Sequence, residues 1–194
     1  MPSAKREHLV DTALALFDRR GFHATGIDTI LAESGVAKMT LYNHFRSKNE
    51  LILAVLRRRD ERFRNWFVRA VERRAKSPRA RLMAVFSVLE EWFGEGGFHG
   101  CLFISAAAEF STESGAIRAS CDEHKKLVVA YLCKLATEAR ARDPQALAED
   151  LSLVMEGAIV TAQITGSTRP AKQARRAAKV LIEAGIGPPD WGRS

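Results

Sequence analysis

The chain has 194 residues, of which 46% are hydrophobic, and a formal net charge of +7 at pH 7. This composition supports one or two compact cores and excludes an intrinsically disordered protein. No window holds eighteen consecutive apolar residues, and the first residues lack the apolar stretch of a signal peptide, so we expect a cytoplasmic protein without a membrane partner.

Apolar residues recur at three- and four-residue spacing along most of the chain, and the apolar–polar alternation typical of strands is absent from the sequence. The sequence therefore predicts an all-α protein. The expected helices cover residues 4–20, 26–34, 38–45, 48–75, 79–94, 100–110, 115–141, 144–165 and 171–184.

The segment that starts at Thr25 has the local signals of two short helices followed by a longer one. Thr25 and Asp28 have the spacing of a capping box, which predicts a helix start at Thr25. Gly35 stands where a left-handed cap would end this helix. Ser47 and Glu50 form a second capping box, which predicts that a long helix begins directly after Ser47.

The short helix between these signals has a mixed polar face. Leu41 and Phe45 are expected to point inward. The residues left outside are Lys38, Met39, Thr40, Asn43 and His44, with Tyr42 at the rim. Two short helices joined by a tight turn, with a mixed polar face on the second, are typical of the helix-turn-helix that enters the DNA major groove. A short helix with Lys and Asn is also a common solvated surface, so the pattern alone leaves both readings open.

The amino-acid sequence of this segment is more specific than its pattern of helices and polar residues. Gly35 to Leu51 read GVAKMTLYNHFRSKNEL, which closely resembles the signature of the TetR family of transcriptional regulators. Ala37 stands where the family often has a capping Ser, and Met39 where it often has Gly. The resemblance covers roughly the first fifty residues; the remainder agrees only in helical character and length. It implies a homodimer with a helix-turn-helix domain over residues 1–47 and a helical effector-binding and dimerisation domain over residues 48–194.

For a protein of this kind the partner is double-stranded operator DNA with a pseudo-palindromic sequence. Thr40 and Asn43 are our candidates for reading base edges, because an Asn amide can bond adenine through two hydrogen bonds. Met39 could contact a thymine methyl group. The candidates for holding phosphates are Thr25, Tyr42, His44 and Lys48, and Lys38 could serve either purpose.

A basic run follows the helix-turn-helix. Residues 57–81 contain eleven Lys or Arg and three acidic residues, so this run alone accounts for the positive net charge. Such a run is commonly a solvated helix face. Its first turns could also attract DNA phosphates over a distance.

The middle of the chain concentrates aromatic residues with a few polar ones among them. Aromatics at helical spacing commonly fill a core, whereas polar company favours a ligand cavity. The resemblance places a small-molecule effector of unknown identity in this part of the chain. The candidate effector residues are Trp66, Phe86, Glu90, Trp92, Phe93, Phe103, Glu109 and His124.

The last two expected helices are apolar over a wide arc. Such helices bury two faces, either both in one monomer core or one against a partner. The resemblance favours a partner, because TetR-like proteins pair through their last two helices. The candidate dimer contacts are Leu151, Met155, Ala158, Ala162, Ala174, Ala177, Ala178 and Leu181.

Other functional classes have weaker signals. Cys121 and His124 lie three residues apart, but no second pair completes a metal shell, and the cysteines are expected to be reduced thiols. Ser105 lacks the context of a nucleophile, so we expect no enzyme, catalytic residue or cofactor. The best reading is a repressor released from its operator by an effector. The alternative is a helix-turn-helix activator or architectural DNA-binding protein without an effector.

Overall fold

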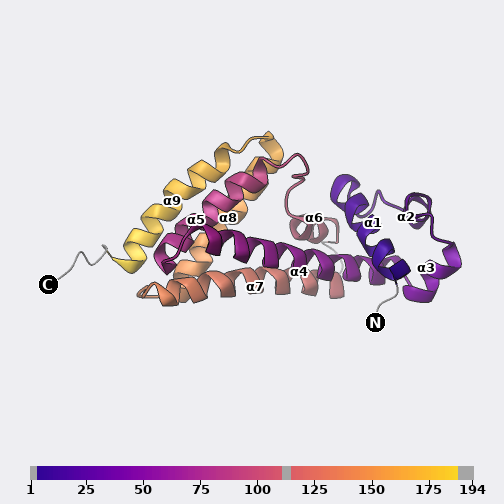
Figure 1. The fold of residues 1–194 in the computed structure, drawn as a ribbon, viewed down its shortest axis with the longest axis horizontal. Helices are drawn as coiled ribbons and strands as arrows, with labels where there is room; N and C mark the ends of the chain where they lie inside the picture. The colour runs from indigo at the N-terminus through magenta and orange to yellow at the C-terminus, as the bar shows by residue number, and fades with distance from the viewer. Residues whose placement is uncertain (1–3, 111–114, 188–194) are drawn as a thin grey trace. The chain divides into compact units, whose positions relative to one another are not determined.

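The computed structural model describes residues 4–110 and 115–187, which form α-helices and contain no strand (Figure 1). The helices are α1 (Ala4–Arg20), α2 (Ile27–Ser34), α3 (Lys38–His44), α4 (Lys48–Arg74), α5 (Pro78–Phe93), α6 (Leu102–Glu109), α7 (Ala116–Glu138), α8 (Pro144–Thr165) and α9 (Arg169–Ile186). The all-α prediction is confirmed, and the helix ends lie close to the expected ones. In the described part of the chain, we find no helix with the length and apolar character needed to cross a membrane.

Local capping sets several of these ends as the sequence predicts. Gly35 adopts a left-handed conformation with φ of 64° and its N–H donates to the Leu31 carbonyl, which ends α2. The Glu50 amide donates to Ser47 Oγ at 3.2 Å, and Glu50 Oε2 accepts from the Arg46 amide at 2.8 Å. The second capping box is therefore confirmed, with the returning bond one residue earlier than in the standard motif.

The first capping box is wrong. Helix α2 begins at Ile27, and its N-cap residue Gly26 makes no side-chain cap. Thr25 is fully buried, and its hydroxyl donates backward to the Gly21 carbonyl at 2.8 Å. The N-cap position that the motif requires of Thr25 is therefore taken by Gly26, which has no side chain to complete the box with Asp28.

The chain forms two compact units. One consists of residues 4–63, 101–110 and 115–124, so α6 and the start of α7 pack with α1, α2, α3 and the first part of α4. The other consists of residues 64–100 and 125–187. These packing units do not follow the expected boundary at residue 47. A packing unit need not equal a functional domain, so the division into 1–47 and 48–194 stays a prediction.

The core of the first unit contains large apolar side chains from the inward faces of α1 and α4. Burying one such side chain contributes roughly 1.5–3 kcal/mol to the free energy of folding. Phe17 stacks on Phe22 with ring centroids 4.9 Å apart, which joins α1 to the segment that follows it. The fully buried side chains of this unit include Leu9, Leu16, Phe17, Phe22, Ile30, Leu41, Leu51, Ile52 and Leu56.

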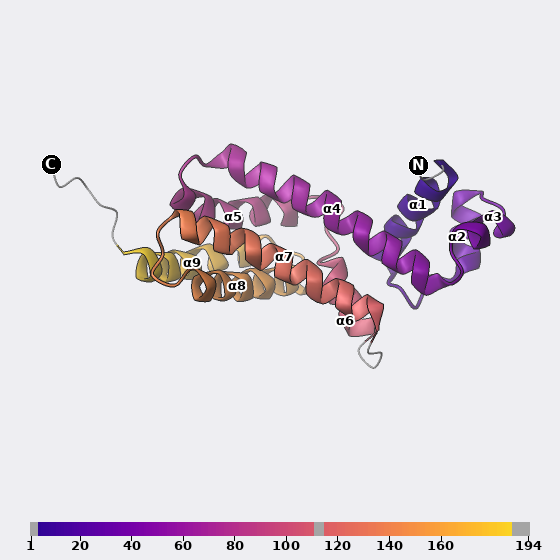
Figure 2. The same cartoon turned by 90° about the horizontal axis from the view of Figure 1, so that it is seen from below.

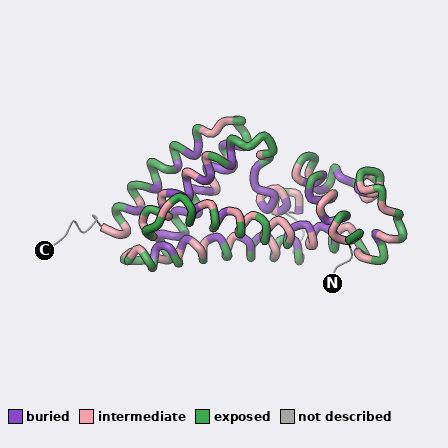
Figure 3. Tube along the Cα trace, in the orientation of Figure 1, coloured by how far each residue is buried: buried purple, intermediate pink, exposed green. Residues whose placement is uncertain are grey.

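The second unit is a helical bundle in which α8 and α9 pack on each other and both pack on α5 (Figure 2). Ser77 caps α5 by accepting from the Ala80 amide, and Asp143 caps α8 by accepting from the Ala146 amide at 3.0 Å. Helices α8 and α9 each carry both buried and exposed positions along their length, whereas α5 is buried or half-buried at most positions (Figure 3).

Candidate functional sites

Helix α3 has a buried side and a largely polar exposed side. Leu41 is fully buried, as expected, and anchors the helix in the first unit. Lys38 and Asn43 are exposed, and the exposed fractions of Met39 and Tyr42 are 73% and 44%. An exposed row with an apolar methionine, an amide and an ammonium suits a DNA groove, where edges of bases offer both methyl groups and hydrogen-bonding atoms.

The remaining α3 candidates are less accessible. Thr40 and His44 are half-buried. Lys38 Nζ lies 3.7 Å from Asp28 Oδ1, and both side chains are mostly exposed. Exposed ion pairs of this kind contribute about 0–1 kcal/mol to stability. Lys38 can therefore leave the Asp28 carboxylate for a DNA phosphate at little cost in free energy.

Two predicted phosphate ligands are used inside the protein. The Thr25 side chain is fully buried and does not present its hydroxyl to a phosphate. Lys48 is half-buried and its Nζ donates to the Phe22 carbonyl at 2.6 Å. Burial lowers the pKa of Lys48, and the nearby Glu109 carboxylate opposes that shift. The geometry therefore gives both side chains a role in holding the segment between α1 and α2.

Glu109, at the end of α6, holds the same segment from the other side. Its Oε1 accepts from the Phe22 amide at 2.9 Å, and its Oε2 accepts from the His23 amide at 2.6 Å. The Glu109 carbonyl also lies 2.9 Å from His23 Nε2. Gly21 has φ of +83°, and a Cβ there would lie 2.9 Å from Glu109 Oε1. We call Gly21 to His23, with the Glu109 and Lys48 side chains, the α1–α2 clamp.

The clamp gives Glu109 a structural role, because each of its carboxylate oxygens accepts a hydrogen bond from a backbone amide of this chain. Its predicted use as an effector residue stays a prediction. Sequence spacing could not reveal these hydrogen bonds, because the bonded residues lie 86 and 87 positions apart.

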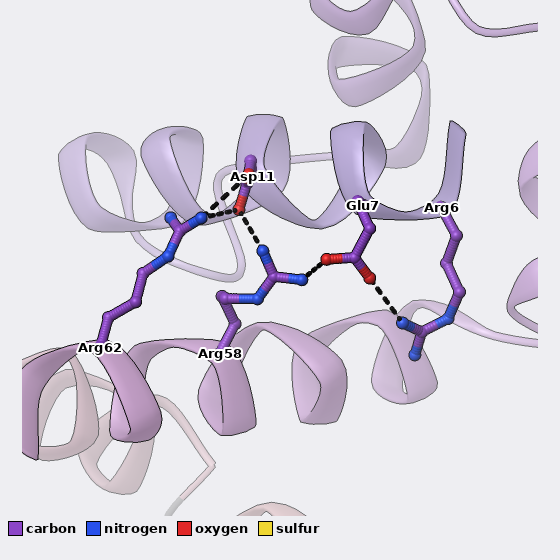
Figure 4. A network of polar contacts seen from close by, with 5 residues as sticks. All are labelled: Arg6, Glu7, Asp11, Arg58 and Arg62. Carbon is purple, nitrogen blue, oxygen red and sulfur yellow. Dashed lines mark hydrogen bonds and ion pairs between the residues drawn. The ribbon is translucent and has the colours of Figure 1, made fainter. Parts of the chain in front are cut away.

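A network of ion pairs joins α1 to α4 (Figure 4). Arg58 Nη1 lies 3.1 Å from Asp11 Oδ1, and Arg58 also pairs with Glu7. Arg62 Nη2 lies 2.9 Å from the same Asp11 oxygen, and Arg6 lies 3.4 Å from Glu7. The first turns of the basic run therefore carry a structural role, since they fasten α4 to α1.

The structure divides the candidate effector residues between the two units. In the second unit the Trp66 and Trp92 rings lie 6.4 Å apart and the Trp92 and Phe93 rings 5.9 Å apart, while Phe86 is buried. Glu90 Oε1, on the same helix as Trp92, lies 3.3 Å from Lys172 Nζ. This group is brought together as expected, and its use as an effector site stays a prediction.

The other effector candidates meet in the first unit. Phe103 stacks on His124 with ring centroids 3.7 Å apart, and the His124 side chain is only 4% exposed. His124 Nδ1 lies 2.7 Å from Asp60 Oδ1. Sequence analysis missed Asp60, because it lies within the basic run and 64 residues from its partner.

Most of the predicted dimer contacts are covered within their own chain. A side chain covered by its own chain has no surface to offer a partner. Ala177 is exposed and Leu181 is half-buried. The six that are buried within the monomer are Leu151, Met155, Ala158, Ala162, Ala174 and Ala178.

A different set of apolar residues on these two helices faces outward. Leu153 and Ile164 on α8 are 76% and 78% exposed, and Val180 on α9 is 66% exposed. Gly157 lies between Leu153 and Ile164 in sequence, and a Cβ added there would meet no atom within 4 Å. These four residues and Ala177 are the outer α8–α9 face.

Comparison with known families agrees with this architecture. The family described as "Bacterial regulatory proteins, tetR family" matches residues 9–55. The family described as "Tetracyclin repressor-like, C-terminal domain" matches residues 78–178, which is more than half of the chain. The chain therefore belongs to the TetR family of DNA-binding transcriptional regulators, and the resemblance seen in the sequence is confirmed.

Individual relatives support this membership over most of the chain. The HTH-type transcriptional repressor NemR of Escherichia coli (strain K12) is 27% identical over 185 residues, which cover 91% of this chain and 93% of NemR. A crystal structure of reduced E. coli NemR superimposes with a TM-score of 0.84 and covers 92% of this chain and 96% of that one. A TetR-family regulator from Streptomyces coelicolor has a TM-score of 0.88 at 25% identity, covering 96% of this chain and 92% of its own.

Proposed function

We propose that this protein is a homodimeric repressor that leaves a pseudo-palindromic operator when a small-molecule effector binds. The observation that carries the DNA-binding part is the exposed side of α3, where Lys38, Met39 and Asn43 stand on a helix anchored from below by Leu41. The likeness to NemR, a repressor, over nearly the whole chain supports repression. A protein acting on the chromosome works in the cytoplasm.

In this proposal α3 enters the major groove. Asn43 reads an adenine through its amide, and Met39 contacts a thymine methyl group. Lys38 exchanges its weak pairing with Asp28 for a phosphate. Thr40, Tyr42 and His44 complete the contact surface from less exposed positions.

A dimer is required because the two recognition helices must sit about 34–36 Å apart to reach successive major grooves. The outer α8–α9 face is the surface that we assign to this contact. Leu153 and Ile164 expose large apolar side chains in one stripe, and Gly157 leaves room for a partner helix to approach closely.

The DNA-reading part can be tested by selecting binding sites from random double-stranded DNA with the purified full-length protein. We expect a two-fold symmetric site with half-sites about 10 base pairs apart, centre to centre. Asn43→Ala should lose discrimination at one position per half-site, by roughly 5- to 150-fold for a mismatch worth about 1–3 kcal/mol. Asn65→Ala, on an exposed position of α4, is the matched control. An unchanged sequence preference for Asn43→Ala would remove Asn43 from base reading.

An activator is the second candidate, and one observation favours keeping it. The HTH-type transcriptional activator FasR of Mycolicibacterium smegmatis is 50% identical over 54 residues, which cover 28% of this chain and 25% of FasR. The likeness is therefore confined to a short segment of each protein, and it does not separate the two modes. In vitro transcription from a promoter carrying the selected site separates them, since a repressor lowers the transcript level and an activator raises it.

A screen of aromatic and lipophilic compounds tests the effector part. A compound that weakens operator binding and also raises the melting temperature of the free protein supports the proposal. Operator binding that no such compound alters favours the architectural alternative.

A further inference from the structure

A groove with a strongly positive lining lies in the second unit, apart from the aromatic group. Its volume is about 460 Å³, within the range of small-molecule sites. It is formed by the end of α4, one face of α5 and one flank of α9. The lining residues are Arg74, Ala75, Ser77, Arg79, Ala80, Met83, Ala84, Ser87 and Arg175.

Three arginines from three different helices line this groove, and its lining includes no acidic residue. Arg79 Nη1 donates to the Gly187 carbonyl at 2.6 Å, and Arg74 pairs with Glu91, which lies outside the lining. Within the part of the chain that the structure describes, Arg175 has neither an ion pair nor a side-chain hydrogen bond. Like charges gathered around one hollow repel one another, and a bound anion relieves that repulsion.

One face of α5 contributes mostly small side chains to the lining. Ala80, Ala84 and Ser87 recur at four- and three-residue spacing, and the apolar Met83 lies beside them. The small alanines leave space above the helix, and a methionine side chain adapts to ligands of different shapes. The stretch from Ser77 to Ser87 is about 15 Å long at 1.5 Å per residue, which suits an unbranched chain lying along the helix.

We propose that this groove binds a small amphiphilic organic anion, with a carboxylate or phosphate head held by the three arginines and an apolar part on Met83 and the α5 alanines. Arginine presents planar, forked donors that match both kinds of head group. The site is distinct from the proposed effector site, since none of the effector candidates lines it.

The groove remains open when the outer α8–α9 face pairs with a partner. Arg175 and Ala177 are two residues apart on α9, so they point about 200° apart around the helix axis. Arg175 lies on the flank toward α5, whereas Ala177 belongs to the outer face. Dimerisation therefore does not compete with binding.

The test is calorimetric titration of the full-length protein with octanoate and octyl phosphate, using octanol as the neutral match and inorganic phosphate as the head group alone. We expect saturable binding of the two amphiphiles at one site per chain, with octanol and inorganic phosphate at least about tenfold weaker. The two anionic probes distinguish a carboxylate from a phosphate preference. Inorganic phosphate that binds as tightly as octyl phosphate would overturn the apolar part of the proposal.

Neighbouring arginines supply the matched variants. Arg175→Ala should weaken octanoate binding about tenfold, because one charged donor is lost. Arg176→Ala, which changes the next exposed residue outside the lining, should leave it unchanged. Equal losses of octanoate affinity in the two variants would show that binding depends only on the general positive charge of α9, which would overturn the site. A change of oligomeric mass in Arg175→Ala on sedimentation would identify the groove as an interface instead.

Discussion

Replacing Glu109 by alanine tests the α1–α2 clamp. The substitution removes the acceptor for the Phe22 and His23 amides, at 2.9 and 2.6 Å. Hydrogen bonds to a charged group contribute about 1.5–3 kcal/mol each. His23 is exposed, so water can replace part of the hydrogen bond that its amide loses. We therefore expect the free energy of unfolding to fall by about 2–4 kcal/mol. For a chain of this size that lowers the melting temperature by roughly 5–15 °C.

Circular dichroism during thermal and urea unfolding of the purified protein measures this loss. Glu123→Ala, an exposed glutamate on α7, is the control and should change the unfolding free energy by less than about 0.5 kcal/mol. Glu109→Gln should lie between wild type and Glu109→Ala, because an amide keeps one acceptor oxygen and loses the charge.

A double-mutant cycle with Gly21 isolates the contact itself. Gly21→Ala places a methyl group 2.9 Å from Glu109 Oε1 on a backbone with φ of +83°, so it should destabilise through both strain and displacement of the carboxylate. In Gly21→Ala with Glu109→Ala the displacement term vanishes, and the combined loss should be smaller than the sum by at least about 0.5 kcal/mol. Strictly additive losses, or an unchanged melting temperature for Glu109→Ala, would refute the clamp.

Three further outcomes are expected. Leu153→Glu should give a folded monomer on sedimentation that no longer binds the operator, because Leu153 is 76% exposed in one chain; an intact dimer would move the interface elsewhere. Lys48→Ala should lower the melting temperature without changing the salt dependence of DNA binding, whereas a slope reduced by about one would restore a phosphate contact. Burial, followed by the charge of Glu72, raises the pKa of Tyr131 to about 12, above the value in the unfolded chain. The neutral phenol therefore stabilises the fold below pH 10, and this contribution is lost as the pH rises toward 12. Tyr131→Phe should reduce that loss in urea unfolding at pH 9 and 11, and equal losses in both proteins would contradict the assignment.

The sequence by itself determined the features that depend on neighbouring residues. Helix spans follow from spacings of three and four residues, and the caps at Gly35 and Ser47 involve bonds within four residues. The exposed side of α3 was also predictable, because Leu41 and Phe45 define its buried side. These signals are local, so they survive without knowledge of the rest of the fold.

Tertiary structure decided every assignment that depends on a distant partner. Lys48 had the residue type of a phosphate ligand, yet its Nζ donates to the carbonyl of Phe22, 26 residues earlier. Glu109 was predicted only as a polar group in an aromatic cavity, and the structure shows that its carboxylate accepts from amides 86 and 87 residues away. On α8 the periodicity showed that a wide arc is apolar. Only the packing of α5 and α9 decided which part of that arc, such as Met155, is buried and which part, such as Leu153, is exposed. The hydrophobic effect is not directional, so the sequence pattern of a helix gives only the extent of its apolar surface. The neighbouring helices determine which part of that surface is covered.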